Sequence, residues 1–306
     1  MNRCAIIGCG MIAGGYDNTD DSKIRTHAKA YINSPNCTLV GVSDYNENIA
    51  SDFSKKWSVP FYSNDPNELL KQTRPDILSI CTPTESHEEI FNLACSMGIK
   101  NIWLEKPAAQ SIDAVRRMEA LAKKSDTNVW INYFRRYDPG FHMVKSRIKE
   151  LGKIRNVQAV YTKGTRHNGS HILDIILWLF GEVTYVRVKE VLNDSHYESI
   201  SAQLKTDVAN IELVALDYNA YELFELDILA DKGRIRIIDG GQNISFESVV
   251  KDKYYKGYKN LSVEKVHKGS YEMFMANGLS MALNGEEMPG FKNEMKLHLL
   301  LNKLEA

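Results

Sequence analysis

Cysteine, net charge and long apolar runs are all scarce in this sequence, and each scarcity excludes a class of protein. The five cysteines are odd in number, lie in the first third of the 306 residues and show no CxxC spacing. We therefore expect neither disulfides nor a zinc site, and we interpret the cysteines as small buried residues. Lysine and arginine (38) balance aspartate and glutamate (39), which leaves a formal net charge of -1. No overall field attracts nucleic acid or a membrane surface, so neither partner is expected.

Apolar residues do not form a segment suited to export or membrane insertion. The best run, Ile172 to Phe180, is short and contains Asp174, whereas a helix that spans a bilayer needs about 20 apolar residues. The N-terminus lacks the apolar region and the cleavage site of a signal peptide. The sequence therefore predicts a cytoplasmic protein, and it contains no repeats and no proline-rich linker.

The order of the predicted elements indicates two domains. The first part of the chain alternates short β-branched runs with helical patterns, which is typical of βαβ units and a doubly wound parallel sheet. After Arg136 the strand-like runs follow one another with few helices between them, which favours a mainly antiparallel sheet. We therefore predict an α/β domain over residues 1–133 and an α+β domain with an open, mainly antiparallel sheet over residues 134–306.

The predicted elements can be given as residue ranges. In the first domain the strands are Cys4–Gly8, Thr38–Ser43, Ile77–Cys81, Asn101–Leu104 and Asn128–Ile131, and the helices are Thr26–Ile32, Ser86–Met97 and Ser111–Lys124. In the second domain the strands are Val157–Lys163, Val183–Val191, Ser199–Lys205, Asn210–Asp217, Leu223–Ala230 and Arg234–Ile238, and the helices are Gly140–Leu151, Ser170–Phe180, Tyr271–Leu283 and Lys292–Leu304. The lysine-rich stretch Lys251–Lys256 is expected to be a solvated edge strand or hairpin.

The first predicted strand runs directly into a glycine-rich turn. Residues Gly8 to Ala13 read GCGMIA, which matches the GxGxxA pattern of a dinucleotide-binding turn. Gly8 permits the tight turn, Gly10 lets a diphosphate approach the backbone, and Ala13 allows close packing of a helix on the strand. Met11 and Ile12 open the expected helix, whose N-terminus offers N–H groups to the phosphates. We therefore expect a Rossmann domain that binds a dinucleotide.

Asp44 ends the second predicted strand. A carboxylate at this position can accept hydrogen bonds from the ribose hydroxyls of the cofactor and repels a 2′-phosphate, which favours NAD and makes NADP the less favoured cofactor. An exposed turn aspartate is the alternative. Asp44 lies further from the glycines than usual because an insertion, Tyr16–Arg25, splits the first helical region. The insertion could lie near the cofactor or be a solvated surface loop.

Several further segments match one family in order along residues 1–181. They read THAKAY from Thr26, CTPTESH from Cys81, EKP from Glu105, NYFRRYDP from Asn132 and NGSHILD from Asn168. With the glycine turn, they resemble the Gfo/Idh/MocA family of NAD(P)-dependent oxidoreductases. The resemblance implies a cis peptide before Pro107 and a homo-oligomer, either dimer or tetramer. It also implies that the cofactor is contacted by Thr82, Pro83, His87, Glu105 and Lys106.

Lys106 and His171 are the predicted catalytic residues. A lysine at the carboxyl end of a parallel strand can stabilise the alkoxide that develops during hydride transfer, although a solvated lysine is the ordinary reading of that position. The resemblance implies that Lys106 reaches both the nicotinamide ribose and the substrate hydroxyl. It also implies that His171 takes the carbinol proton, which an imidazole can do near neutral pH. From the residues alone, a histidine bonded to Asp174 for stability is the more common case.

The substrate pocket is predicted less sharply. Its expected lining residues are Asn132, Tyr133, Arg136, His167, Asn168 and Asp174. Arg136 could instead form a structural pair with Asp138. Polyol dehydrogenases of the family often carry an aspartate where this chain has His167, so the substrate class stays open. No metal is expected, because Gly169 and the expected helix cap Ser170 place His167 outside the helix of His171.

Taken together, the sequence predicts an NAD(P)-dependent dehydrogenase or reductase that acts on a CH–OH group of a sugar, polyol or nucleotide-linked sugar. Two alternatives stay open. The enzyme could retain NAD for an elimination or a glycoside cleavage, which would use the same residues. The chain could also be a dinucleotide-binding regulator that has kept the fold without the chemistry.

Overall fold

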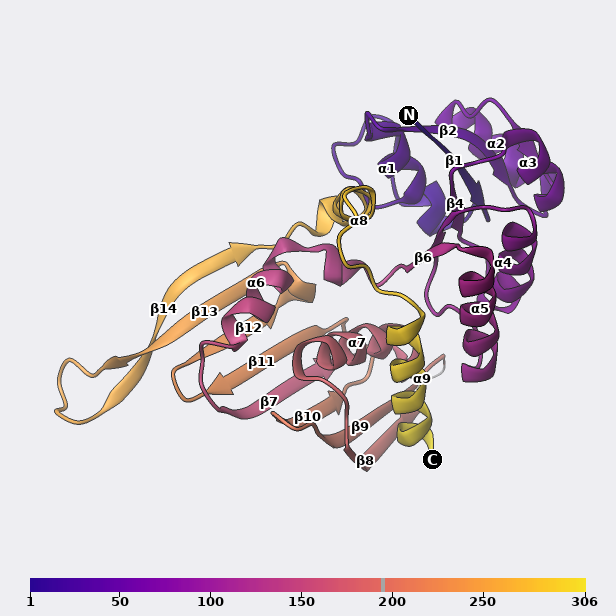
Figure 1. Ribbon diagram of the computed structural model, residues 1–306. Helices are drawn as coiled ribbons and strands as arrows, with labels where there is room; N and C mark the ends of the chain where they lie inside the picture. Colours follow the sequence, from indigo (N-terminus) through magenta and orange to yellow (C-terminus); the bar gives the residue numbers. More distant parts are fainter. Residues whose placement is uncertain (194–195) are drawn as a thin grey trace. The chain divides into compact units, whose positions relative to one another are not determined.

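The computed structural model describes residues 1–193 and 196–306, which form two units (Figure 1). The first unit contains Met1–Tyr137 and Glu272–Met295, and the second contains Asp138–Tyr271 and Lys296–Ala306. The sequence analysis assigned every residue after 133 to the second domain. The structure groups residues 272–295 with the first unit, because helix α8 (Phe274–Leu283) packs against helix α1 (His27–Asn33).

The first unit is built on a six-stranded parallel sheet in the order β3-β2-β1-β4-β5-β6. The strands are β1 (Asn2–Ile7), β2 (Cys37–Ser43), β3 (Tyr62–Ser63), β4 (Ile77–Ile80), β5 (Asn101–Leu104) and β6 (Asn128–Ile131). The strand order reverses between β1 and β4, and doubly wound sheets bind ligands at the carboxyl ends of the strands at such a point. The predicted Rossmann fold is confirmed.

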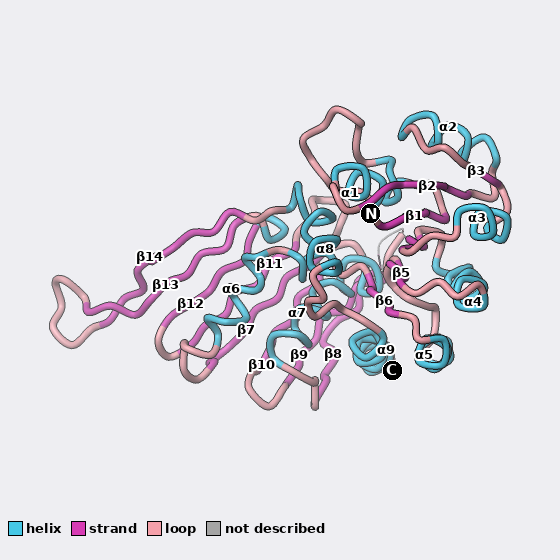
Figure 2. Tube along the Cα trace, turned by 45° about the horizontal axis from the view of Figure 1, so that its top comes forward, coloured by secondary structure: helices cyan, strands magenta, loops and turns pink. Residues whose placement is uncertain are grey.

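Helices cover both faces of this sheet. Residues of α1, α2 (Glu47–Trp57) and α8 share one apolar core with β1 and β2. Helix α4 (His87–Ser96) packs against α3 (Pro66–Thr73) and α5 (Ile112–Ser125), and Figure 2 shows the strands running between the two groups. Helices α2 and α3 were not predicted, although each has a side-chain cap, supplied by Asn46 and Asp65. Helix α5 is capped in the same way, since the Ser111 hydroxyl accepts a hydrogen bond from the backbone N of Ala114.

The glycine turn is not followed by a full α-helix, which corrects the sequence expectation. Met11–Gly15 form a five-residue π-helical turn, and α1 begins only at His27. Because the helix dipole grows with the number of aligned peptides, the turn can offer N–H groups but only a small dipole. The insertion at 16–25 is anchored at its start, because the buried Asp17 carboxyl accepts hydrogen bonds from the backbone N of Arg25 (2.7 Å) and the Thr26 hydroxyl (2.8 Å).

The second unit contains an eight-stranded sheet in the order β14-β13-β12-β11-β7-β10-β9-β8. Its neighbouring strands pair antiparallel except for β7 and β10, which are parallel. The predicted mainly antiparallel sheet is therefore confirmed. The strands are β7 (Ile154–Tyr161), β8 (Tyr185–Asn193), β9 (Glu198–Lys205), β10 (Asn210–Ala215), β11 (Phe224–Ala230), β12 (Gly233–Ile238), β13 (Asn243–Lys251) and β14 (Lys259–Lys268).

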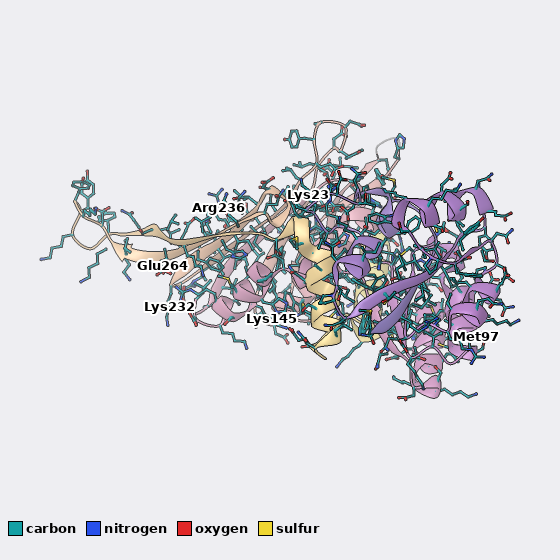
Figure 3. The ribbon with its side chains drawn as sticks, turned by 90° about the horizontal axis from the view of Figure 1, so that it is seen from above. Lys23, Met97, Lys145, Lys232, Arg236 and Glu264 are labelled. Carbon is teal, nitrogen blue, oxygen red and sulfur yellow. The ribbon has the colours of Figure 1, made fainter. Side chains whose placement is uncertain are left out.

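Helices α6 (Pro139–Ile148) and α7 (Gly169–Phe180) belong to the second unit, and α9 (Phe291–Glu305) ends the chain. Strands β13 and β14 form a long hairpin at the edge of the sheet, and the lysine-rich stretch lies at the end of β13 and in the following turn, as the sequence predicts; the length of the two strands was not predicted. Glu264 on this hairpin, labelled in Figure 3, accepts a hydrogen bond from Arg147 of α6 (2.7 Å). Within 1–193 and 196–306, no helix has the length and apolar character needed to cross a membrane.

Candidate cofactor site

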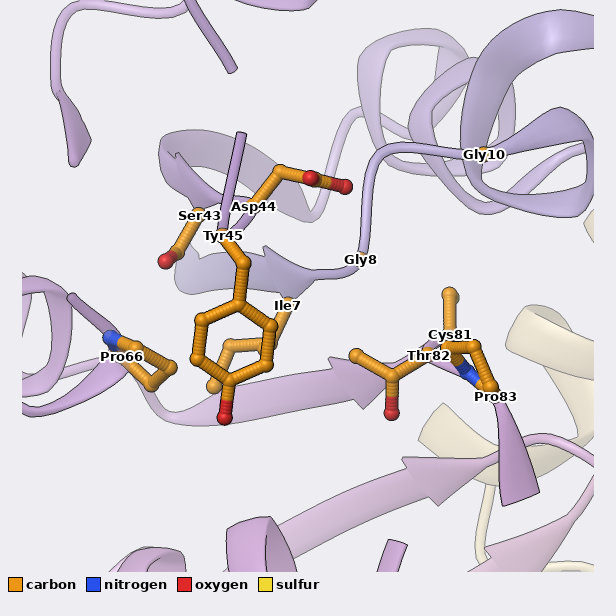
Figure 4. Close-up of a pocket in the computed structure, with 10 residues that line it drawn as sticks. All are labelled: Ile7, Gly8, Gly10, Ser43, Asp44, Tyr45, Pro66, Cys81, Thr82 and Pro83. Carbon is orange, nitrogen blue, oxygen red and sulfur yellow. The ribbon is translucent and has the colours of Figure 1, made fainter. Parts of the chain in front are cut away.

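A pocket of about 430 Å³ opens at the carboxyl ends of β1, β2 and β4 (Figure 4). Its lining residues are Ile7, Gly8, Gly10, Ser43, Asp44, Tyr45, Pro66, Cys81, Thr82 and Pro83. Five of them were predicted cofactor contacts: Gly8, Gly10, Asp44, Thr82 and Pro83. The structure brings these five together around one cavity, at the point where the strand order reverses.

The two glycines of the turn have different physical reasons to lack a side chain. Gly8 has φ +90°, and a Cβ there would lie 2.6 Å from the backbone carbon of Cys81. A Cβ at Gly10 would meet nothing within 4 Å. Gly8 is therefore required by the protein itself, whereas Gly10 leaves open space beside the pocket through which a diphosphate could approach the backbone.

Asp44 joins the end of β2 to the glycine turn. One carboxyl oxygen accepts a hydrogen bond from the backbone N of Cys9 (2.9 Å), and the other accepts one from the backbone N of Asn46 (3.0 Å). Figure 4 shows the carboxyl group pointing toward the segment between Gly8 and Gly10. Each carboxylate oxygen has two lone pairs, so Asp44 keeps acceptor capacity for the hydroxyls of a ligand.

Two buried hydroxyls line the same pocket. Thr82 was a predicted cofactor contact, whereas Ser43 was not predicted. The Ser43 and Thr82 hydroxyl oxygens have no hydrogen-bond partner among the residues that the structure describes. A buried polar atom without a partner costs free energy, so such atoms commonly mark the place of a ligand or a water. These hydroxyls, together with the open space at Gly10, fit a polar ligand such as a dinucleotide.

Tyr45 and Pro66 add an apolar side to the pocket that the sequence analysis missed. Tyr45 follows Asp44 directly and is 65% exposed, and its ring extends into the pocket region between Pro66 and Thr82 in Figure 4. Flat apolar surfaces of this kind suit a planar base. The position of Tyr45 next to Asp44 was an available signal, whereas Pro66 begins α3, a helix that the patterns did not predict.

His87 lies behind the pocket wall and does not line the cavity. Its side chain is only 1% exposed. The ring nitrogen Nε2 is 2.9 Å from the Thr82 carbonyl oxygen, and Nδ1 is 3.0 Å from the Pro107 carbonyl oxygen. His87 thus joins two loops, one of which carries the pocket residue Thr82, and its contact with the cofactor stays a prediction.

A buried chain of hydrogen bonds holds Glu105, the residue before Lys106. Glu105 Oε1 accepts a hydrogen bond from Asn132 Nδ2 (2.6 Å) and lies 2.9 Å from His27 Nε2. The other ring nitrogen of His27 is 2.8 Å from the Ser79 hydroxyl, which is 2.6 Å from the Tyr31 hydroxyl. Because these partners come from α1, β4 and the end of β6 and are buried, they fix the orientation of Glu105.

Lys106 lies in the loop after β5, at the same edge of the sheet as the pocket, since all six strands are parallel. The Lys106–Pro107 peptide bond is cis, as the resemblance implies. Tyr133 and Asn132, predicted to contact substrate, are each 1% exposed. The Tyr133 hydroxyl donates a hydrogen bond to Glu294 (2.6 Å). Both side chains thus hold the loop that carries Lys106 through buried hydrogen bonds, Asn132 directly at Glu105 and Tyr133 through Glu294, which binds Ala108. Arg136 is also buried.

The remaining predicted residues lie in the second unit. His171 and Asp174 belong to α7 and are 7% and 2% exposed. His167 lies in a separate π-helical turn before α7, with its ring 5.4 Å from that of Tyr197, and Asn168 donates a hydrogen bond to the Leu223 carbonyl (3.3 Å). Throughout the described part of the chain, no group of three or more histidine, cysteine or acidic side chains is arranged to hold a metal ion.

Two thiols lie close to the pocket. All five cysteines are free and buried, as predicted. Burial raises the pKa of the Cys9 thiol well above its usual range, and the Asp44 carboxyl raises it further. Burial, followed by the charges of Glu105 and Cys9, likewise raises the pKa of Cys81. Both thiols stay protonated at neutral pH, so neither is an activated nucleophile.

Comparison with known proteins identifies the first unit. A family model described as "Oxidoreductase family, NAD-binding Rossmann fold" (GFO_IDH_MocA) matches residues 2–133. Residues 2–133 belong to this family. The match covers the sheet, the glycine turn, Asp44 and the EKP segment, so the N-terminal unit is an NAD-binding Rossmann domain.

Curated relatives are similar over part of the chain. The scyllo-inositol 2-dehydrogenase (NAD(+)) of Bacillus subtilis (strain 168) is 31% identical over 172 residues, which is 55% of this chain and 45% of that protein. The D-glucoside 3-dehydrogenase of Escherichia coli (strain K12) is 25% identical over 219 residues, which is 66% of this chain and 59% of that protein. The matched segments thus span about half the length of these relatives.

Solved structures extend the similarity in fold to the whole chain. An NAD-binding oxidoreductase from Klebsiella pneumoniae superimposes with a TM-score of 0.80 and covers 100% of this chain and 96% of its own. The sequence identity is 15%. Both units therefore have the fold of this oxidoreductase.

Proposed function

We propose that this chain is an NAD-dependent oxidoreductase that transfers a hydride between the nicotinamide and a hydroxyl- or keto-bearing carbon of a sugar, polyol or nucleotide-linked sugar. The observation that carries the proposal is the gathering of the glycine turn, Asp44 and the Glu105–Lys106 pair at one edge of the first sheet. The substrate class is supported by the names of the relatives, which are inositol and glucoside dehydrogenases.

The pocket residues fit NAD better than NADP. Gly10 leaves room for the diphosphate, and Asp44 can accept hydrogen bonds from ribose hydroxyls while it repels a 2′-phosphate. The buried hydroxyls of Ser43 and Thr82 supply further polar contacts, and Tyr45 can lie against the base. When bound, NAD supplies the hydride acceptor that no side chain can replace.

Lys106 and His171 are assigned the chemistry of the substrate hydroxyl. The Lys106 ammonium would stabilise the negative charge that develops on the substrate oxygen, which is the largest electrostatic need of the reaction. Glu105, held by His27 and Asn132, would keep the start of the lysine loop in place. His171 would accept the hydroxyl proton as a general base, with Asp174 in the same buried helix turn.

The test is a panel of inositols, glucosides and sugar nucleotides, assayed with NAD or NADH by the absorbance of the reduced nicotinamide. We expect turnover with at least one member, and we expect Lys106→Ala to bind NADH but to lose turnover by roughly 10²–10³-fold. Normal turnover by Lys106→Ala would overturn the mechanism. Product formed without net change in NADH would favour the NAD-retaining alternative, and NADH binding without any turnover would favour a regulator. The cytoplasmic location and the homo-oligomer stay predictions from the sequence.

A further inference from the structure

A single peptide group after Lys106 is held at both of its polar atoms by buried side chains. The carbonyl oxygen of Pro107 lies 3.0 Å from His87 Nδ1, and the backbone N of Ala108 donates a 2.9 Å hydrogen bond to Glu294 Oε1. His87 is 1% exposed and Glu294 is 0% exposed. Because a peptide group is planar and its C=O and N–H point in opposite directions, the two side chains hold this group from opposite sides.

Each of these side chains also has a second fixed contact. His87 Nε2 reaches the carbonyl of Thr82, a residue of the pocket wall. Glu294 Oε2 accepts a hydrogen bond from the Tyr133 hydroxyl (2.6 Å), so the carboxyl group itself has a set orientation. The peptide group is therefore joined to the cofactor pocket on one side and, through the first turns of α9, to the C-terminal part of the first unit on the other.

We propose that Glu294 is a positioning residue for Lys106, acting together with His87 through the Pro107–Ala108 peptide. This inference rests on the proposed function. Proline fixes its own φ, so an anchored peptide on its far side leaves the lysine backbone few conformations. In reactions that depend on orientation, a displacement of about 1 Å can lower the rate roughly 10²-fold.

Burial of a carboxyl group argues against a role in packing alone. Taking such a group out of water is costly unless its oxygens are hydrogen-bonded, and an apolar side chain would fill the same volume without that cost. What Glu294 offers and an apolar residue lacks is a pair of acceptors in fixed directions, matched to the Ala108 N–H and the Tyr133 hydroxyl. One of these acceptors binds the Ala108 N–H, in the loop that carries Lys106, and the other fixes the orientation of the carboxyl group.

The test compares two variants of Glu294 with a control variant at Glu287. Glu294→Leu removes both acceptors, and we expect kcat to fall roughly 10²-fold while the Kd for NADH is unchanged. Glu294→Gln should restore kcat to within a few-fold of wild type, because its amide oxygen can still accept from Ala108 and its NH₂ group can donate to the Tyr133 oxygen. Glu287→Leu, at an exposed position of the same C-terminal segment, is the matched control and should leave kcat unchanged.

A second readout needs no substrate. Trace acetylation of Lys106 by acetic anhydride, quantified by mass spectrometry, should be slowed by saturating NADH in the wild type. In Glu294→Leu we expect NADH to bind, as measured by its fluorescence, but to protect Lys106 much less. A Glu294→Leu protein that binds NADH and keeps both wild-type kcat and wild-type protection would overturn the proposal.

Two further variants keep the outcome interpretable. If Glu294→Leu does not fold, Glu294→Asp withdraws the carboxyl group by one methylene and should still lower kcat; wild-type kcat in that variant would overturn the proposal. Lys106→Ala is assayed in parallel. An active Lys106→Ala would contradict the proposed function itself, whereas an inactive Lys106→Ala beside a fully active Glu294→Leu would contradict only the positioning role.

Discussion

The side chain of Asn132 donates a 2.6 Å hydrogen bond to Oε1 of Glu105. The two residues follow the ends of neighbouring parallel strands, because Leu104 of β5 pairs with Ile131 of β6. The backbone N of Asn132 also donates to the Leu104 carbonyl (2.8 Å). The motifs EKP and NYFRRYDP, which are separate in the sequence, thus begin side by side at the edge of the sheet. Asn132, the first residue of the second motif, holds Glu105, the first residue of the first motif.

This contact predicts that Asn132 is sensitive to charge. In Asn132→Asp a second carboxyl group would face Glu105 in a buried site, so we expect a loss of about 2–3 kcal/mol in the free energy of unfolding, together with a lower kcat. Asn132→Ala removes the donor without adding charge and should cost less. Urea unfolding measures both, with Asn128→Asp at the exposed start of β6, the strand that Asn132 follows, as control. Equal stability of Asn132→Asp and Asn128→Asp would contradict the prediction.

The glycine turn predicts opposite results for two similar substitutions. Gly8→Ala forces an alanine to φ +90° against the backbone of Cys81, so it should lower the free energy of unfolding by about 1–3 kcal/mol. Gly10→Ala places its methyl group in open space and should leave the melting temperature unchanged. If the diphosphate passes over Gly10, the same methyl group should weaken NADH binding. Thermal denaturation and NADH fluorescence titration separate the two effects, and tight NADH binding by Gly10→Ala would place the diphosphate elsewhere.

Asp44 should control both the affinity for the cofactor and the choice between NADH and NADPH. Asp44→Ala removes an acceptor for ribose hydroxyls, so the Kd for NADH should rise roughly tenfold or more. It also removes the charge that repels a 2′-phosphate, so the Kd for NADPH should rise less or fall. Parallel titrations with the two reduced cofactors measure the ratio. Asp52→Ala, at an exposed position of α2, is the control, and an unchanged ratio in Asp44→Ala would exclude ribose recognition by this carboxyl.

The buried thiols predict a loss of stability at alkaline pH. Burial raises the pKa of Cys9 and Cys81 in the folded protein, whereas an unfolded thiol ionises near a pKa of about 8.5. Above that pH the unfolded chain releases these protons and the folded chain retains them. The stabilisation is thus fully present below the ordinary thiol pKa and is lost as pH rises, by up to about 1.4 kcal/mol per pH unit for each thiol.

The measurement is the free energy of unfolding from pH 7 to pH 10.5, in reducing buffer. The double variant Cys9→Ala/Cys81→Ala should lose stability less steeply over this range than the wild type, even if its stability at neutral pH is lower. Identical slopes for the two proteins would show that these thiols do not carry the alkaline transition.

Short apolar strands beside turn residues were predicted with their observed bounds, whereas helices α2 and α3 were missed although their buried residues follow the helical period. The observed bounds of β5 and β6 are those predicted, because both strands are short apolar runs beside turn residues. Strand β14 is exposed along nearly its whole length, and its alternation of apolar and polar residues is short: it covers Leu261 and Val263 and is interrupted at a register shift before Val266. Its existence depends on pairing with β13, which is a tertiary contact.

The sequence by itself determined the glycine turn, Asp44 and the Glu105–Lys106 pair, because each is a local pattern at the end of a strand, and the ends of parallel strands meet at one edge of a sheet. The tertiary structure alone decided which of the predicted residues face the pocket. It placed His87 and Tyr133 in buried hydrogen bonds and brought Glu294 to Ala108, 186 residues earlier in the chain. Contacts of this kind depend on where the chain returns, and neither the periodicity nor the spacing of residues records that path.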